Sequence, residues 1–65
     1  MVQKLITQTT LSELLTTREV SEYLKVPVGT LYKWRREGIG PISFRVGRGT
    51  RYRRSDVEAW IDERS

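Results

Sequence analysis

The stretch Val28-Gly-Thr-Leu-Tyr-Lys-Trp-Arg-Arg-Glu37 decides the fold of this chain. Its apolar residues recur at the spacing of an α-helix, in which each residue is rotated by about 100° from the one before. The apolar side of such a helix consists of Val28, Leu31 and Trp34. The opposite side consists of Gly29, Lys33 and Arg36. We therefore expect a helix over residues 28–37 with one apolar face and one cationic face.

A shorter helix is predicted just before it, over residues 17–24. Thr16 is a suitable N-cap, and Glu19 follows three residues later, so the two can form a capping box. The apolar stripe, at positions i, i+3 and i+4, consists of Val20, Tyr23 and Leu24. Pro27 separates the two helices, because it lacks an N–H group and restricts the residue before it to an extended conformation. Two short helices joined by a three-residue turn predict a helix-turn-helix.

After Gly38, which provides a left-handed helix stop, and the turn at Gly40-Pro41, the period of the sequence changes from 3.6 to 2. Residues 42–46 alternate apolar and polar side chains, residues 47–50 are turn residues, and residues 51–53 alternate again. This pattern predicts a β-hairpin with an arginine in its loop. Alternation leaves the arginines partly on the solvent side and directs three side chains towards the helices: Phe44, Val46 and Tyr52.

A third helix is predicted after the hairpin, with Ser55 as its N-cap and Glu58 in the capping-box position. Its buried stripe consists of Val57, Trp60 and Ile61. The helix is acidic, which argues against contact with a polyanion. Trp34 and Trp60 both fall on apolar stripes, and a small core needs large side chains, so we interpret them as core residues and not as platforms for stacked bases.

Together these elements predict a mainly α fold with a small β-hairpin, a winged helix-turn-helix of three short helices and a two-stranded wing. A chain of 65 residues allows one small domain. We assign it to residues 11–65. Residues 1–10 have mixed polarity and no sustained period, which predicts an N-terminal arm that is disordered or marginally ordered.

The charge is concentrated in one part of the chain. The net charge is +4, and the isoelectric point is about 10.0. Residues 33–54 contain eight cations and one anion, a net charge of +7, whereas the rest of the chain has a net charge of −3. Like charges at this density repel one another unless a partner neutralises them. The pattern indicates a surface that binds a polyanion.

Composition also excludes several classes of protein. The sequence contains no Cys and no His, which excludes a disulfide framework, a Cys/His zinc site, a Ser-His-Asp triad and a histidine general base. We expect no enzyme activity, no metal and no cofactor. The apolar runs are too short to span a membrane, and the N-terminal apolar stretch is too short for a signal peptide, so we expect a soluble cytoplasmic protein.

Three blocks of the sequence carry a family resemblance: Leu15 to Leu24, Val26-Pro-Val-Gly-Thr-Leu-Tyr-Lys-Trp-Arg-Arg-Glu-Gly38, and Phe44-Arg-Val-Gly-Arg-Gly-Thr-Arg-Tyr-Arg-Arg-Ser-Asp-Val-Glu-Ala-Trp60. At this spacing the chain resembles the excisionase-family winged helix-turn-helix, which is related to the MerR-like DNA-binding domains. The resemblance covers roughly residues 14–62. Two positions depart from the family pattern, because Pro27 replaces a usual Ser or Thr cap and Arg35 replaces a usual apolar residue.

The expected partner is double-stranded DNA, with the helix over 28–37 in the major groove and the wing in the adjacent minor groove. The candidate contacts on the helix are Val28, Gly29, Thr30, Tyr32, Lys33 and Arg36. Those on the wing are Arg45, Arg48, Arg51 and Arg53. Among the donors on the helix, Lys33 and Arg36 are the best suited to a guanine edge.

Three alternatives remain open at individual residues. Tyr32 either binds a phosphate or packs beneath the wing, and Arg35 is either a DNA contact or a structural residue. Arg51 and Arg54 either contact DNA or pair with an acid such as Asp56 or Glu19.

The resemblance implies a phage or mobile-element excisionase, which bends DNA and directs a site-specific integrase towards excision in the cytoplasm or nucleoid of a bacterial host. A domain this small contacts few bases, so we expect cooperative self-association on adjacent sites. Two other functions are compatible with the sequence. One is a small transcriptional regulator of the same fold, and the other is an interaction module that binds an acidic protein.

Overall fold

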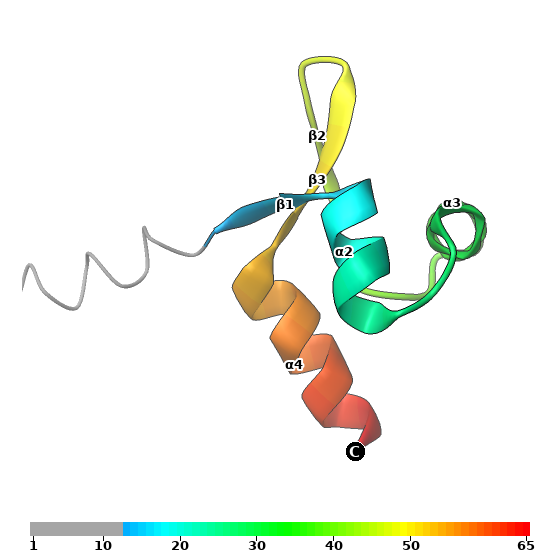
Figure 1. The fold of residues 1–65 in the computed structure, drawn as a ribbon, viewed down its shortest axis with the longest axis vertical. Coiled ribbons are helices and arrows are strands. Elements are labelled where there is room, and N and C mark those ends of the chain that lie inside the picture. Colours follow the sequence, from blue (N-terminus) through cyan, green and yellow to red (C-terminus); the bar gives the residue numbers. More distant parts are fainter. Residues whose placement is uncertain (1–12) are drawn as a thin grey trace, which may run out of the picture.

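The computed structural model describes residues 13–65, and the predicted arm at residues 1–10 lies outside this range. These residues form three helices and a small sheet, arranged as Figure 1 shows. The elements are β1 (Leu14–Thr16), α2 (Thr17–Leu24), α3 (Val28–Glu37), β2 (Phe44–Val46), β3 (Gly49–Arg53) and α4 (Arg54–Arg64). The predicted fold class, mainly helical with a β wing, is confirmed.

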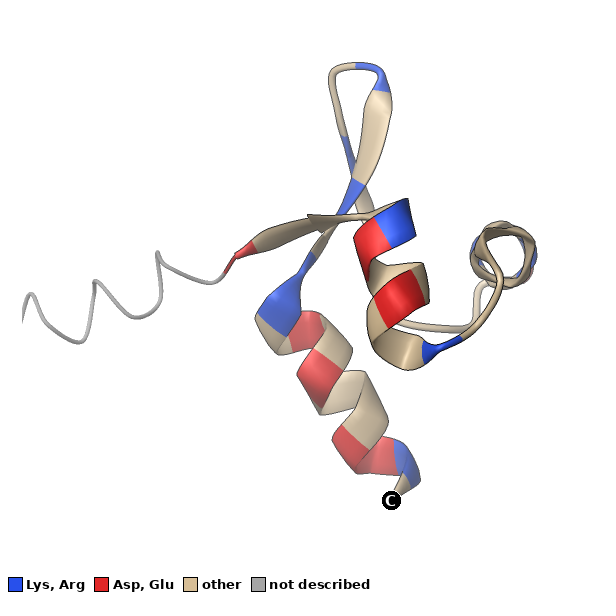
Figure 2. Ribbon diagram, in the orientation of Figure 1, with Lys and Arg blue, Asp and Glu red and all other residues tan. Residues whose placement is uncertain are grey.

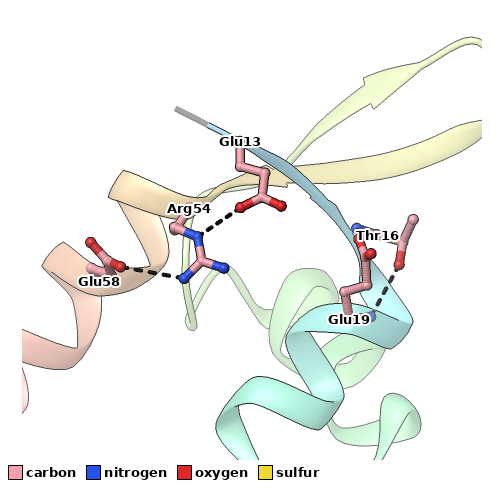
Figure 3. Close-up of polar contacts among 5 residues, drawn as sticks. All are labelled: Glu13, Thr16, Glu19, Arg54 and Glu58. Atoms are coloured by element: carbon pink, nitrogen blue, oxygen red, sulfur yellow. Dashed lines mark hydrogen bonds and ion pairs between the residues drawn. The ribbon is translucent and has the colours of Figure 1, made fainter. Parts of the chain in front are cut away.

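Helix α2 begins with the predicted capping box. The backbone N–H of Glu19 donates to the Thr16 hydroxyl at 3.0 Å, and the backbone N–H of Thr16 donates to the Glu19 carboxylate at 2.8 Å (Figure 3). These two bonds satisfy N–H groups that would otherwise lack partners at the helix start. The helix ends at Lys25, which has a left-handed φ of 61°.

Helix α3 follows after the turn at Pro27. The Pro27 carbonyl accepts a hydrogen bond from the backbone N–H of Thr30 at 3.0 Å, and no side chain caps the helix. At the other end, Gly38 has a φ of 75°, which favours glycine. Both predicted helices of the helix-turn-helix therefore have the predicted bounds.

The sheet has three antiparallel strands in the order β1-β3-β2, not the predicted two. The additional strand, β1, pairs Leu15 with Tyr52 and leads directly into α2. The hairpin turn is also tighter than expected. Val46 pairs with Gly49, so only Gly47 and Arg48 form the turn, and Gly47 has the positive φ of 60° that such turns require.

This register decides which side chains share a face of the sheet. We call the face with Leu15 and Tyr52 the inner face, because both residues are buried against the helices. Phe44 pairs with Arg51 and not with Tyr52. Successive residues point to opposite faces, so Phe44 and Val46 lie on the outer face. The prediction that Phe44 and Val46 face the helices was wrong, and Val46 is 44% exposed.

The core takes one buried apolar residue from each of β1, α2, α3, β3 and α4. These residues are Leu15, Val20, Leu31, Tyr52 and Val57. Leu24, Val26, Trp34 and Ile61 pack against them. Tyr23, which was predicted to complete the buried stripe of α2, is instead 43% exposed, because it lies at the edge of the helix under the Arg54 guanidinium.

Helix α4 differs from its prediction at its start. It begins at Arg54 directly after β3, so Ser55 lies inside the helix and the predicted capping box is wrong. Val57 is fully buried as predicted, but Trp60 is only half-buried. The ring of Trp60 lies 5.4 Å from that of Trp34, centroid to centroid, and this pair connects α4 to α3.

Candidate nucleic-acid interface

The outward face of α3 is formed by Gly29, Lys33 and Arg36. All three are exposed, and on the helix they lie opposite the buried Leu31. A methyl group added at Gly29 would have no heavy atom within 4 Å, so the backbone here is open to close approach by a ligand. Helix α3 therefore presents two cations and an unobstructed backbone to solvent.

The other candidate residues of α3 lie beside this face. Val28 and Thr30 are half-buried near the helix start, and Tyr32 is 46% exposed. Tyr32 follows Leu31 on the side of the helix that faces Tyr52, and the two tyrosines interact electrostatically. Tyr32 thus lies on a flank of α3 near Tyr52, with much of its side chain accessible.

Cations follow the whole length of the hairpin, which extends away from the helices (Figures 1 and 2). Arg48 occupies the two-residue turn at the tip and is exposed. Arg45 is also exposed and pairs with Thr50, two residues before Tyr52, which places Arg45 on the inner face. The hairpin therefore carries cations at its tip and on the side of the helices.

Arg51 and Arg53 lie on the outer face, and each has an intramolecular contact. Arg51 donates from Nη1 to the Thr50 carbonyl oxygen at 2.9 Å, with its guanidinium close over Gly49. The guanidinium carbon of Arg53 lies 5.3 Å from the centroid of the Phe44 ring, a cation–π arrangement. The register thus places Arg45 on the opposite face of the hairpin from Arg51 and Arg53, which the sequence pattern did not indicate.

Tyr52 connects the hairpin to both helices of the helix-turn-helix. Burial raises the pKa of its phenol above the ordinary value, while the nearby Arg35 guanidinium and a hydrogen bond with the Thr17 side chain lower it. Thr17 begins α2 and Arg35 is near the end of α3. The buried Tyr52 ring is therefore hydrogen-bonded to the start of α2 and lies near the Arg35 guanidinium of α3.

Arg54 belongs to the basic block in sequence but is held by acids of the chain. Its Nε donates to the Glu13 carboxylate at 2.9 Å, and its Nη1 lies 3.7 Å from Glu58 (Figure 3). The hydrogen bond and charge of Glu13 raise the pKa of this guanidinium above its ordinary value. The acids expected as its partners, Asp56 and Glu19, are not the ones it contacts.

The charges of the two ends of the molecule are opposite in sign. Figure 2 shows the acids of α4 along a helix that extends away from the hairpin tip, where Arg48 lies.

Within residues 13–65, no group of three or more Asp or Glu side chains is arranged to hold a metal ion. Over the same range, no helix combines the length and apolar character that a membrane span requires.

The comparison with family models identifies the region that contains this surface. The model of the helix-turn-helix domain matches residues 14–65, which is most of the chain and includes α3, the hairpin and α4. No curated protein and no solved structure is significantly similar to the chain. The chain belongs to the helix-turn-helix domain family, and it is a sequence-specific protein that binds double-stranded DNA.

Proposed function

We propose that α3 reads the major groove and that the hairpin contacts the adjacent minor groove. The observation that carries this proposal is the outward face of α3, where Lys33 and Arg36 are exposed opposite the buried Leu31. A major groove about 12 Å wide admits a helix, and Lys or Arg side chains bind the O6 and N7 atoms of guanine. Arg48, at the tip of the hairpin, is the cation best suited to a narrow minor groove.

The salt dependence of binding tests whether the partner is DNA or an acidic protein. Neutralising about five phosphates gives a slope of log K against log salt near −4.5. We expect this slope on duplex DNA. A shallow slope would favour a largely apolar interface with a protein.

We further propose that the protein is a phage or mobile-element excisionase that directs an integrase towards excision and has no catalytic role of its own. The resemblance of residues 14–62 to excisionases supports this role. The size of the domain supports assembly on tandem sites, because a single module buries only about 600–1,000 Å² on DNA.

Opposite charges at the two ends support contacts between neighbouring copies. Each copy has a cationic hairpin and an acidic α4 (Figure 2). We infer that the hairpin of one copy contacts α4 of the next when both bind DNA in the same direction. Such head-to-tail contacts use two different surfaces of each copy, so they form an open row of copies along the DNA and not a closed ring. Copies on adjacent sites would add their bends.

A titration on DNA with one, two or three direct repeats tests the excisionase role. With repeats spaced by about 10 to 10.5 base pairs, we expect cooperative binding and a bend that increases with each copy. A matched DNA with an added half turn between repeats places neighbours on opposite faces and serves as the control. With the cognate integrase, the protein should stimulate excision and inhibit integration. Independent binding, no bend and no effect on recombination would leave the transcriptional regulator as the function.

Replacing Gly29 by Ala should stabilise the fold but weaken DNA binding. Gly29 lies in the first turn of α3 with open space around it, so alanine should raise the free energy of unfolding by about 0.5–1 kcal/mol. The added methyl group should at the same time weaken DNA binding, because it lies on the face that approaches the bases. Urea unfolding and fluorescence anisotropy measure the two effects. Unchanged affinity in a stabilised variant would show that Gly29 is not close to DNA.

A further inference from the structure

A second surface lies between α3 and the hairpin. It is separate from the outward face of α3, which contains Lys33 and Arg36, and from the tip of the hairpin at Arg48. On α3, this surface is bordered by Tyr32 and Arg35, which lie on the flank of the helix next to Leu31. Leu31 shares the core with Tyr52 of β3, and the other flank of α3 packs through Trp34 on α4. Tyr32 and Arg35 therefore lie on the flank towards the sheet, where both affect the Tyr52 phenol electrostatically. The Arg35 side chain is exposed.

Arg45 borders the same surface from the hairpin. It pairs with Thr50, and Thr50 is two residues before Tyr52 on β3, so all three share the inner face. Arg45 lies beyond the buried part of that face and is exposed. Within residues 13–65, neither Arg35 nor Arg45 forms an ion pair with a carboxylate, so both cations are available to an anion.

The proposed function places a specific part of DNA against this surface. When α3 lies in a major groove and the hairpin tip in the adjacent minor groove, one sugar-phosphate strand separates the two grooves. That strand must run between α3 and the hairpin. Phosphate contacts of this kind fix the position of a protein on DNA without reading its sequence.

We propose that Arg35 and Arg45 bind the phosphodiesters of this intervening strand, whereas Arg51 and Arg53 do not contact DNA. Arg51 and Arg53 are on the outer face, directed away from α3, and their guanidinium groups contact the Thr50 carbonyl oxygen and the Phe44 ring. They stiffen the hairpin. This inference rests on the proposed function, and it assigns Arg35 a role in DNA binding.

The test compares single alanine variants of four arginines on the same domain. Binding to a duplex with one selected site is measured by anisotropy at several salt concentrations. Arg35→Ala and Arg45→Ala should each reduce the magnitude of the slope of log K against log salt by about 1 and weaken binding similarly on all sequences. Arg51→Ala and Arg53→Ala remove the same charge from the outer face and should leave the slope unchanged. Circular dichroism checks that all four variants are folded.

Duplexes with single neutral methylphosphonates locate the contact. Neutralising a phosphate between the two grooves should weaken binding of the wild-type protein, and the same change should have little effect on the variant that has already lost its arginine. Equal sensitivity of the wild type and both variants at every such phosphate would overturn the proposal. An equal loss of slope in the Arg51→Ala and Arg53→Ala variants would also overturn it, because the outer face would then contact DNA.

Failure of this inference is distinguishable from failure of the proposed function. If the wild-type protein has a steep salt slope and Lys33→Ala weakens binding, α3 lies on DNA. Unchanged slopes for Arg35→Ala and Arg45→Ala in that case contradict only the phosphate contact. A shallow slope for the wild-type protein itself contradicts the proposed function, and with it the inference.

Discussion

The double variant Lys33→Ala/Arg36→Ala is expected to lose most of its preference for a specific DNA site while remaining folded. Both side chains are exposed and lie opposite the buried Leu31, so their removal leaves the core intact. Each good contact to a base edge contributes about 1–3 kcal/mol of discrimination, so two contacts together correspond to at least a tenfold change in the ratio of specific to non-specific affinity. Anisotropy with a selected duplex and a scrambled duplex measures this ratio.

A control variant removes the same charge elsewhere. Lys25→Asn/Arg64→Gln eliminates two cations at the end of α2 and the end of α4, and asparagine tolerates the left-handed conformation of residue 25. It should retain the ratio of specific to non-specific affinity. If the Lys33→Ala/Arg36→Ala protein also retained that ratio, α3 would not be the element that reads the bases.

Leu31→Ala is expected to unfold the domain or leave it barely stable. Leu31 is 1% exposed and is the only residue of α3 among the fully enclosed core residues. Replacing a buried leucine by alanine costs about 2–5 kcal/mol, and a core of this size rarely supplies more than about 3–5 kcal/mol. Urea unfolding followed by circular dichroism measures the loss.

Tyr32→Ala is the matched control for this effect, because Tyr32 is adjacent in the same helix but 46% exposed. Its substitution should change the free energy of unfolding by much less than that of Leu31. A Leu31→Ala protein with the unfolding midpoint of the wild type would mean that α3 does not pack on the core as described. The orientation of its cationic face would then have no structural basis.

Local signals explain why the two helices of the helix-turn-helix, α2 and α3, could be predicted to the residue. Thr16 and Glu19 form their capping box within four residues of each other, and Pro27 and Gly38 act on their immediate neighbours. None of these signals depends on how the rest of the chain folds. The outward position of Lys33 and Arg36 follows in the same way from the period of a single helix.

The sheet could not be predicted as well, because its pairing connects distant residues. Strand β1 has only three residues and shows no period of its own, and it exists because Leu15 pairs with Tyr52, 37 residues later. The tight turn at Gly47-Arg48 sets the faces of the hairpin. A turn of four residues was expected, and both turn lengths pair Val46 with a residue that points away from Tyr52. The error was to assign Phe44 and Val46 to the face of Tyr52 from the alternation within each strand, without pairing the two strands.

The same error affected the candidate interface. Arg51 and Arg53 flank Tyr52 in one strand, so alternation alone puts them on the opposite face. Arg45 is in the other strand, and only the register shows that it is on the face of Tyr52. The ion pair of Arg54 with Glu13 joins residues 41 positions apart and was equally inaccessible to a local pattern.

In the proposed complex, α3 and the hairpin together form the DNA-binding surface, and α4 lies away from it. Titration of the ¹⁵N-labelled protein with a duplex that carries one selected site maps this surface, because every backbone amide reports on its own surroundings. We predict large chemical-shift changes at Gly29, Lys33 and Arg36 and along residues 45–50, with small changes along the second half of α4. Large changes along the acidic face of α4, with α3 unaffected, would show that α3 and the hairpin are not the DNA-binding surface.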